Sequence, residues 1–177
     1  MSSLGIKSVL IVDESPFYAK ILRTLLQAFE IPTIESFHTY EEAMDRLRTE
    51  PFELLLIDWQ LEGKDKLEII RTIRQGHGIC DPNLPVILCT AHTRRSKIEY
   101  ARDVGVTEIL VKPLRPDQLM SKMLAAFFRN RTFVDSSRYS GPCRRRQIQE
   151  YYGEERRGKA GFDQGQVDDI MEKERNK

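Results

Sequence analysis

Four short runs of consecutive apolar residues place the strongest limit on how this chain can fold. The runs VLIV, LLLI, VILC and ILV lie in the segments 7–13, 52–58, 86–90 and 108–112. A strand that is apolar at every position has both faces covered, as in a parallel sheet packed between two layers of helices. A fifth segment, TIESF at 33–37, alternates apolar with polar residues. We therefore predict that TIESF forms a strand at an edge of the sheet.

A helical pattern of apolar residues follows each of these strands. The predicted helices cover residues 16–29, 40–49, 66–75, 96–105 and 115–130. Repeated strand–helix units predict an α/β fold: a doubly wound five-stranded parallel sheet with five helices. We expect the flavodoxin-like strand order 2-1-3-4-5, because it puts the alternating strand at the edge.

Local signals mark three of the helix ends. Ser15 precedes Pro16, and this pair is typical of an N-cap followed by the first helical position. Thr39 is the predicted N-cap of the second helix, with Glu42 three residues later as in a capping box. Gly105 is expected to end the fourth helix in a left-handed conformation.

Composition narrows the class of protein. A chain of 177 residues allows one full domain and an appendage. A net charge of +1 argues against wholesale binding of nucleic acid, and no apolar run approaches the roughly 20 residues of a membrane span. The first ten residues lack the features of a signal peptide. Three cysteines without C-x-x-C spacing indicate reduced thiols in a cytoplasmic protein.

Polar residues gather where the predicted strands end. Asp13 and Glu14 follow the first strand, Asp58 ends the third, Thr90 ends the fourth and Lys112 ends the fifth. In the order 2-1-3-4-5 these four strands are neighbours, and parallel sheets bind ligands at the carboxyl ends of their strands. The sequence therefore predicts one site built from these residues.

The residue types in this set suit phosphoryl transfer. Crowded carboxylates repel one another unless a cation intervenes, and hard oxygen ligands suit Mg²⁺. Asp58 can then act as a carboxylate nucleophile toward a phosphoryl group. Lys112 supplies a positive charge and Thr90 a hydroxyl donor for the phosphoryl oxygens. Ala91 is small enough to leave the entrance to the site open.

The motifs resemble those of the receiver domain of two-component response regulators, the family of the chemotaxis regulator. The matching segments are VLIVDESPFYAKILRTLL, LLLIDWQLEGKDKLEIIRTIR, VILCTA and EILVKPL, and the resemblance spans about residues 5–128. It implies that a histidine kinase or phosphotransfer protein phosphorylates Asp58 in a phosphorelay. It also implies that Asp13, Glu14, Asp58 and the backbone carbonyl of Gln60 bind Mg²⁺, and that the Lys112–Pro113 bond is cis.

The resemblance has departures, and other classes of protein remain to be compared with it. Glu62 and Lys66 replace a usual proline and glycine, and Ile109 stands where many receivers carry a switching aromatic. A dinucleotide-binding enzyme would need G-x-G-x-x-G after the first strand, where DESP stands. A haloacid-dehalogenase-type phosphatase would place a second acid at Gln60. The open alternative is a pseudo-receiver, which uses the same fold for interactions that do not need phosphorylation.

The chain divides into a receiver domain at 5–130 and an Arg/Gly-rich tail at 131–177, where no strand–helix pattern continues. The tail repeats Y-x-G-x-x-R-R at 139–145 and 151–157. It is expected to be either a partly disordered extension or a docking segment, and it is too short for a DNA-binding output domain. The expected function is signalling through a downstream protein target. We expect no enzymatic activity beyond assisting the domain's own phosphorylation and dephosphorylation, and homodimer formation stays open.

Overall fold

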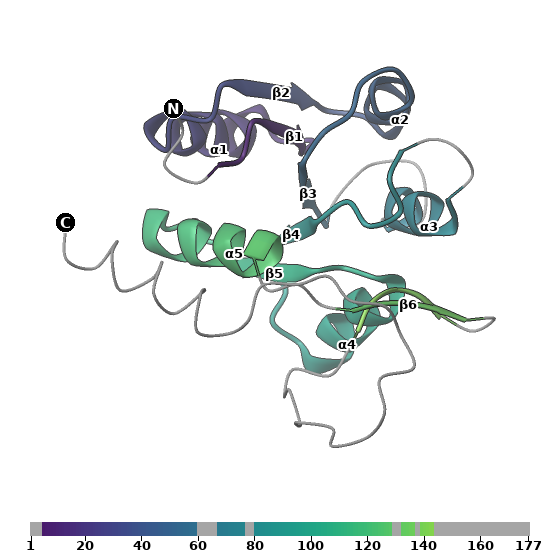
Figure 1. Ribbon diagram of the computed structural model, residues 1–177. Helices are drawn as coiled ribbons and strands as arrows, with labels where there is room; N and C mark the ends of the chain where they lie inside the picture. The colour runs from purple at the N-terminus through teal and green to yellow at the C-terminus, as the bar shows by residue number, and fades with distance from the viewer. Residues whose placement is uncertain (1–4, 60–66, 77–79, 129–131, 137–138, 144–177) are drawn as a thin grey trace.

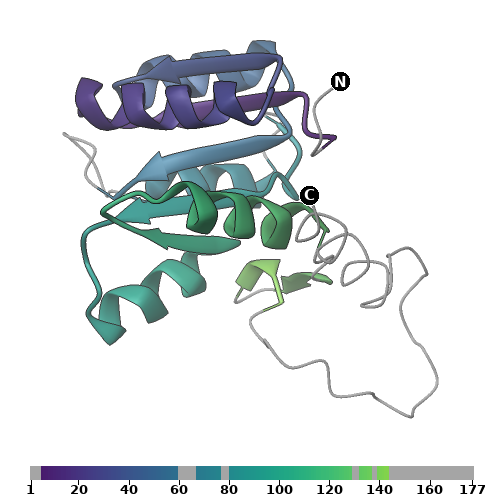
Figure 2. The ribbon, with the colours of Figure 1, turned by 90° about the vertical axis from the view of Figure 1, so that its left-hand side faces the viewer.

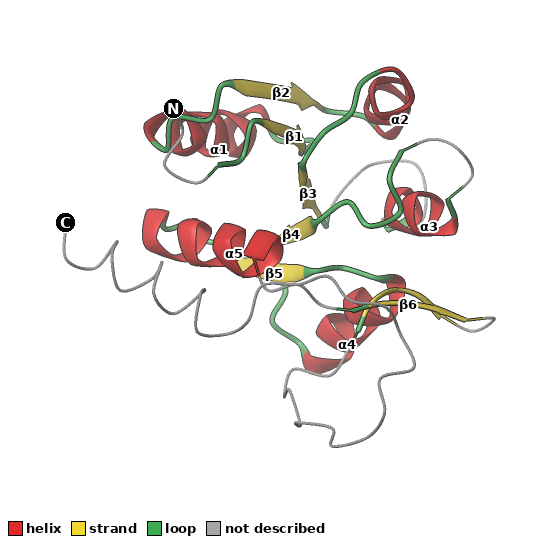
Figure 3. Ribbon diagram, in the orientation of Figure 1, coloured by secondary structure: helices red, strands yellow, loops and turns green. Residues whose placement is uncertain are grey.

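The computed structural model describes residues 5–59, 67–76, 80–128, 132–136 and 139–143. Figure 3 distinguishes the helices from the strands within these ranges. The elements alternate along the chain in the order β1 (Ser8–Val12), α1 (Pro16–Ala28), β2 (Thr33–Phe37), α2 (Tyr40–Thr49), β3 (Leu54–Asp58), α3 (Glu68–Gln75), β4 (Val86–Thr90), α4 (Arg95–Val104), β5 (Glu108–Val111) and α5 (Pro116–Phe128).

The five strands form one parallel sheet in the order β2-β1-β3-β4-β5, which confirms the predicted topology. Helices α1 and α5 cover one face of the sheet, and α2, α3 and α4 cover the other (Figure 1). The turned view in Figure 2 shows the strands running in the same direction, with α1 and α5 in front of them. Strand β2 is only partly buried, as an edge strand should be.

The core lies in two layers, one on each face of the sheet. In β3, Leu54 and Leu56 pack toward α1 and α5, whereas Leu55 and Ile57 pack toward α2, α3 and α4. Successive side chains of a strand point to opposite faces, so a strand between two layers must be apolar throughout. Cys89 of β4 is fully buried in the layer beneath α1 and α5. These interior strands therefore hold their carboxyl ends on a rigid base.

All three predicted capping residues lie at the helix ends, although one of them makes no side-chain bond. Thr39 accepts a hydrogen bond from the backbone N–H of Glu42 at 3.3 Å, and its hydroxyl donates to the Glu42 carboxylate at 2.9 Å. Gly105 ends α4 in the left-handed region. Ser15 occupies the N-cap position of α1, but its side chain makes no capping bond. Its backbone N–H instead donates to Asp13 Oδ1 at 2.9 Å, so the β1–α1 loop is organised by the aspartate.

Beyond residue 130 no strand–helix unit was predicted, and the chain instead forms two further strands that the sequence did not indicate. Strands β6 (Phe133–Ser136) and β7 (Tyr139–Pro142) form an antiparallel hairpin. The hairpin lies against α3 and α4, and Figure 2 places it away from the arrowheads of the sheet. The Ser140 hydroxyl donates to the backbone carbonyl of Arg74 at 2.8 Å, which ties β7 to the end of α3. The arginine pairs of both tail repeats lie outside the described residues.

Two glycines allow the hairpin to approach the end of α4 closely. A Cβ on Gly141 would lie 3.0 Å from the Cα of Gly105, and Gly105 itself has φ of +102°. A Cβ on Gly105 would lie 3.0 Å from Arg74 Cγ and 3.2 Å from the Ser140 carbonyl oxygen. The backbones can meet here because neither residue has a side chain.

We expect Gly105→Ala to lower the free energy of unfolding by about 2 kcal/mol, because alanine is strained at this φ and also crowds the hairpin. Urea denaturation measures the loss. Gly5→Ala is the matched control, because Gly5 has φ of +67° and a Cβ added there would meet nothing within 4 Å. Equal losses in the two variants would show that the hairpin contact has no energetic weight.

Candidate functional site

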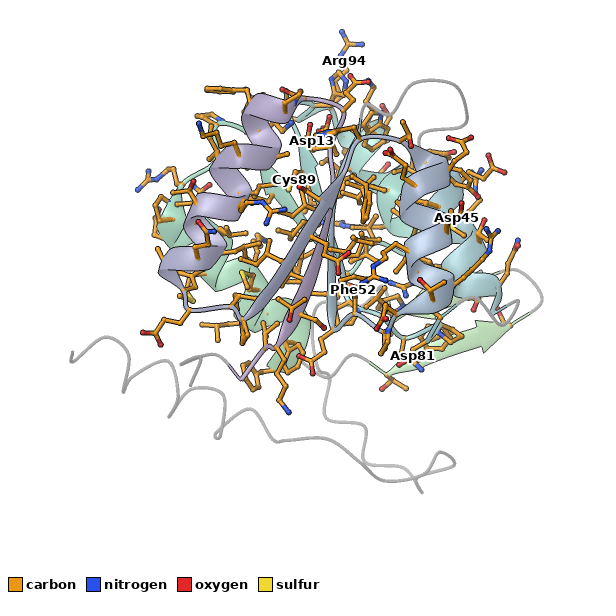
Figure 4. The ribbon with its side chains drawn as sticks, turned by 90° about the horizontal axis from the view of Figure 1, so that it is seen from above. Asp13, Asp45, Phe52, Asp81, Cys89 and Arg94 are labelled. Atoms are coloured by element: carbon orange, nitrogen blue, oxygen red, sulfur yellow. The ribbon has the colours of Figure 1, made fainter. Side chains whose placement is uncertain are left out.

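The register of the sheet places the predicted polar residues in one row. Val12 pairs with Ile57, so Asp13 and Asp58 come at the same level on adjacent strands. Thr90 pairs with Val111, so Lys112 follows directly beside it. Figure 4 shows Asp13 and Arg94 toward one end of the sheet, and Phe52 and Asp81 toward the other.

Lys112 joins the two aspartates of this row. Its Nζ lies 2.9 Å from Asp58 Oδ1 and 3.2 Å from Asp13 Oδ2. The side chains of Lys112, Asp13 and Asp58 are 8%, 1% and 7% exposed, so the three charges meet almost out of contact with solvent. A carboxylate is stable at such a buried place only when it is paired and hydrogen-bonded. The Lys112–Pro113 peptide bond is cis, as the resemblance implied.

The electrostatics of the site follow from this burial. Burial raises the pKa of Asp13, and the neighbouring charge of Asp58 raises it further. The Ser15 N–H and Lys112 oppose that change without cancelling it. Burial alone would lower the pKa of Lys112, but its hydrogen bond to Asp58 and the charges of both aspartates raise it overall. Lys112 is therefore a cation held by two acids that repel each other.

Thr90 and Ala91 complete the row at the end of β4. Thr90 is buried, and its Oγ1 accepts a hydrogen bond from the backbone N–H of His92 at 2.9 Å. Ala91 is exposed and Glu14 is half-buried. Gln60, the remaining predicted residue, lies outside the described part of the chain.

Two residues beside the site were not predicted from the sequence. The Tyr18 ring faces the ammonium of Lys112, with Nζ 3.8 Å from the ring centre. His38 follows β2, and its Nδ1 lies 2.8 Å from the Asp13 carbonyl oxygen, so Nδ1 carries the proton that it donates. Tyr18 lies in the matched segment VLIVDESPFYAKILRTLL, but no pattern in the sequence singles out Tyr18 or His38. The packing of α1 and β2 around β1 brings both side chains here.

Trp59 connects the site to α4. The indole packs edge-on to His92 with ring centres 6.0 Å apart, and Lys97 Nζ lies 5.5 Å from its ring centre. Tyr100 packs on the indole at 6.3 Å. Trp59 immediately follows Asp58, so the end of β3 is in direct contact with α4.

A divalent cation fits the charges of this site, although the ligand set is incomplete in the described residues. Asp13 and Asp58 carry two negative charges against the single charge of Lys112. The pKa of Asp13 is raised mainly by burial and further by the charge of Asp58. Within the described ranges no three His, Cys, Asp or Glu side chains converge closely enough to hold a metal ion. Asp13 and Asp58 are the two carboxylates that meet at Lys112, and a small set of carboxylate oxygens suits Mg²⁺ because this ion keeps several of its waters.

The fold agrees with the comparisons to known proteins. Residues 9–124 match the family of the response regulator receiver domain, and the chain belongs to that family. Chemotaxis protein CheY of Pseudomonas aeruginosa is 27% identical over 121 residues, which are 68% of this chain and 96% of that protein. Sensor histidine kinase GacS of Pseudomonas protegens is 30% identical over 120 residues, which are 66% of this chain but 13% of the kinase.

A solved structure supports the same fold. The chemotaxis response regulator CheY4 of Vibrio cholerae has a TM-score of 0.60 at 23% identity, with 67% of this chain and 96% of that chain covered. At that identity the likeness concerns the fold alone. Among the described helices, none has the length and apolar character that crossing a membrane requires.

Proposed function

We propose that this receiver domain is a phosphoacceptor response regulator. Asp58 receives a phosphoryl group from a histidine kinase or phosphotransfer protein, and the phosphorylated domain signals by binding a downstream protein. The observation that carries the proposal is the buried Lys112 bridge between Asp13 and Asp58, with Thr90 on the next strand.

The proposed reaction is a transfer between two nucleophiles. An oxygen of the Asp58 carboxylate attacks phosphorus, the new O–P bond forms, and the N–P bond to the donor imidazole breaks. The imidazole nitrogen keeps the electron pair of the broken bond. Lys112 and Thr90 stand where a cation and a hydroxyl donor can stabilise the charge on the transferring oxygens.

The metal ligands are part of the same proposal. The Asp13 and Asp58 carboxylates would hold Mg²⁺, and Glu14 and the backbone carbonyl of Gln60 would complete the protein's share. When bound, Mg²⁺ would neutralise the carboxylates and accept an oxygen of the phosphoryl group. Exposed Ala91 leaves room for the donor to approach Asp58.

Incubation with acetyl phosphate tests the proposal without a cognate kinase. We expect one phosphoryl group per chain in the presence of Mg²⁺ and none when EDTA removes it, because the carboxylates otherwise repel the incoming anion. Intact-mass spectrometry counts the groups, and peptide mapping after borohydride trapping should locate the group at Asp58. Asp58→Asn is the control.

Two results would contradict the proposal. A phosphoryl group that persists in Asp58→Asn would place the acceptor elsewhere. An unlabelled wild-type protein that still binds its target would identify a pseudo-receiver.

A further inference from the structure

The ammonium of Lys112 is enclosed on three sides. Two of them are the carboxylates of Asp58 and Asp13, at 2.9 Å and 3.2 Å. The third is the face of the Tyr18 ring, whose centre lies 3.8 Å from Nζ. With the lysine side chain only 8% exposed, the ring takes a place that water would otherwise occupy.

Local structure fixes the ring in this position. Tyr18 lies in the first turn of α1, which begins at Pro16 immediately after the short loop from β1. The Ser15 N–H bond to Asp13 holds that loop. Phe17 packs edge-on to the Tyr18 ring at 5.4 Å and is itself 67% exposed, so it supports the ring from the outer side.

An aromatic face and a carboxylate hold a cation in different ways. The ring attracts the ammonium through its quadrupole, and the attraction is stronger in a desolvated site. The ring carries no net charge, so it neither repels a phosphoryl group nor competes for a metal. In the proposed reaction Lys112 must leave the Asp58 oxygen for an oxygen of the phosphoryl group, whereas its contact with the ring can persist.

We propose that Tyr18 is a positioning residue that keeps the Lys112 ammonium aimed at the acceptor during phosphoryl transfer. The inference rests on the proposed function, because it assigns Tyr18 a part in the same reaction. It concerns the ring face and not the hydroxyl, so phenylalanine should serve as well as tyrosine. Leucine fills similar space without a quadrupole and should not.

The rate of phosphorylation by acetyl phosphate with Mg²⁺ tests the role in the reaction. We expect Tyr18→Leu to lower the maximal rate roughly tenfold with little change in KM, because the ring acts on the orientation of Lys112 in the transition state. Tyr18→Phe should stay within about twofold of wild type. Phe29→Leu is the matched control, a half-buried aromatic at the end of α1 that packs against the core.

The ring contact itself can be measured without any phosphorylation. Protons on a lysine stem held over an aromatic face resonate upfield, so the Lys112 ε-protons should show a ring-current shift in lysine-labelled protein. Lys112→Met assigns the signal. The shift should persist in Tyr18→Phe and disappear in Tyr18→Leu.

The outcomes separate this inference from the proposed function. If wild-type protein takes no phosphoryl group while the ring-current shift is present, the proposed function fails. The contact between Tyr18 and Lys112 then exists but has no part in phosphoryl transfer. If wild type is labelled at Asp58 and Tyr18→Leu reacts as fast, the positioning role is wrong. The positioning role would also be wrong if Tyr18→Phe reacted as slowly as Tyr18→Leu, or if Tyr18→Leu changed only KM.

Discussion

Lys112→Met is expected to slow the phosphorylation of Asp58 by acetyl phosphate about 100-fold in the presence of Mg²⁺. Methionine keeps an unbranched apolar stem of similar length but cannot donate to the transferring oxygens. The substitution removes the ammonium that lies 2.9 Å from Asp58 Oδ1. Stopped samples analysed by intact-mass spectrometry give the rate.

The same substitution should also lower stability, because it leaves two buried carboxylates side by side without their cation. In buffer free of divalent cations we expect the free energy of unfolding to fall by roughly 2–4 kcal/mol. Adding Asp13→Asn should recover part of that loss, since it removes the carboxylate whose pKa is already raised by burial and by Asp58.

Lys122→Met is the matched control for the reaction rate. Lys122 Nζ lies 2.9 Å from Glu108 Oε2, and Glu108 is buried, so this pair also joins a lysine to a buried carboxylate. It belongs to α5 and the amino end of β5, away from Asp58. Phosphorylation at the wild-type rate in Lys112→Met, or an equal slowing in Lys122→Met, would remove the special role assigned to Lys112.

The sheet and the row of site residues were predictable because both depend on local sequence. An interior strand must be apolar at every position, so its limits are visible in the chain, and β4 matched its predicted bounds of 86–90. Each of the four apolar strands ends at, or is directly followed by, one polar residue of the site: Asp13, Asp58, Thr90 and Lys112. Once the strand order is known, their proximity follows from the register alone.

The contacts around that row were not predictable in the same way. Tyr18 is one of several aromatic and apolar residues on α1, and the helical pattern does not distinguish the ring that faces Lys112 from the exposed ring of Phe17. His38 follows the edge strand with no motif around it. Their roles depend on the angle at which α1 and β2 pack against β1, which is a tertiary property.

The hairpin was missed for a related reason. FVDS and YSGP are only four residues each, and YSGP includes glycine and proline, which are poor strand formers. Their pairing is supported by contacts with α3 and α4, including the Ser140 bond to Arg74 and the approach of Gly141 to Gly105. In the sequence Arg74 is one of several charged residues in a helical pattern, yet it is 3% exposed.

Arg74 is a buried cation held by backbone carbonyls. Its guanidinium donates to the Gly105 carbonyl at 3.0 Å and the Leu84 carbonyl at 2.8 Å, and it also donates to the Pro82 carbonyl. Burial lowers the pKa of Arg74 to about 10. The planar fork of arginine can serve these separate oxygens at once, and the single ammonium of a lysine cannot. Arg74 thus links the end of α3 to the loop before β4 and to the turn after α4.

Arg74→Met should lower the free energy of unfolding by roughly 2–4 kcal/mol, because it leaves carbonyl oxygens in the interior without donors. Removing the buried charge offsets only part of this loss. Arg74→Lys should lose a similar amount, because its ammonium reaches too few of the oxygens. Urea denaturation measures both. Arg71→Met is the matched control one turn earlier on α3, where the half-buried guanidinium contacts the exposed Tyr100, and it should lose less than about 1 kcal/mol.

Hydrogen exchange extends the same test to the boundary of the folded unit. The backbone carbonyl of Arg74 accepts the Ser140 hydroxyl, and its side chain holds the Gly105 turn on which Gly141 rests. Amides of β6 and β7 should therefore exchange faster in Arg74→Met than in Arg71→Met. That result would extend the folded unit from the predicted boundary at 130 to residue 143. Equal exchange in the two variants would mean that the hairpin forms independently of Arg74.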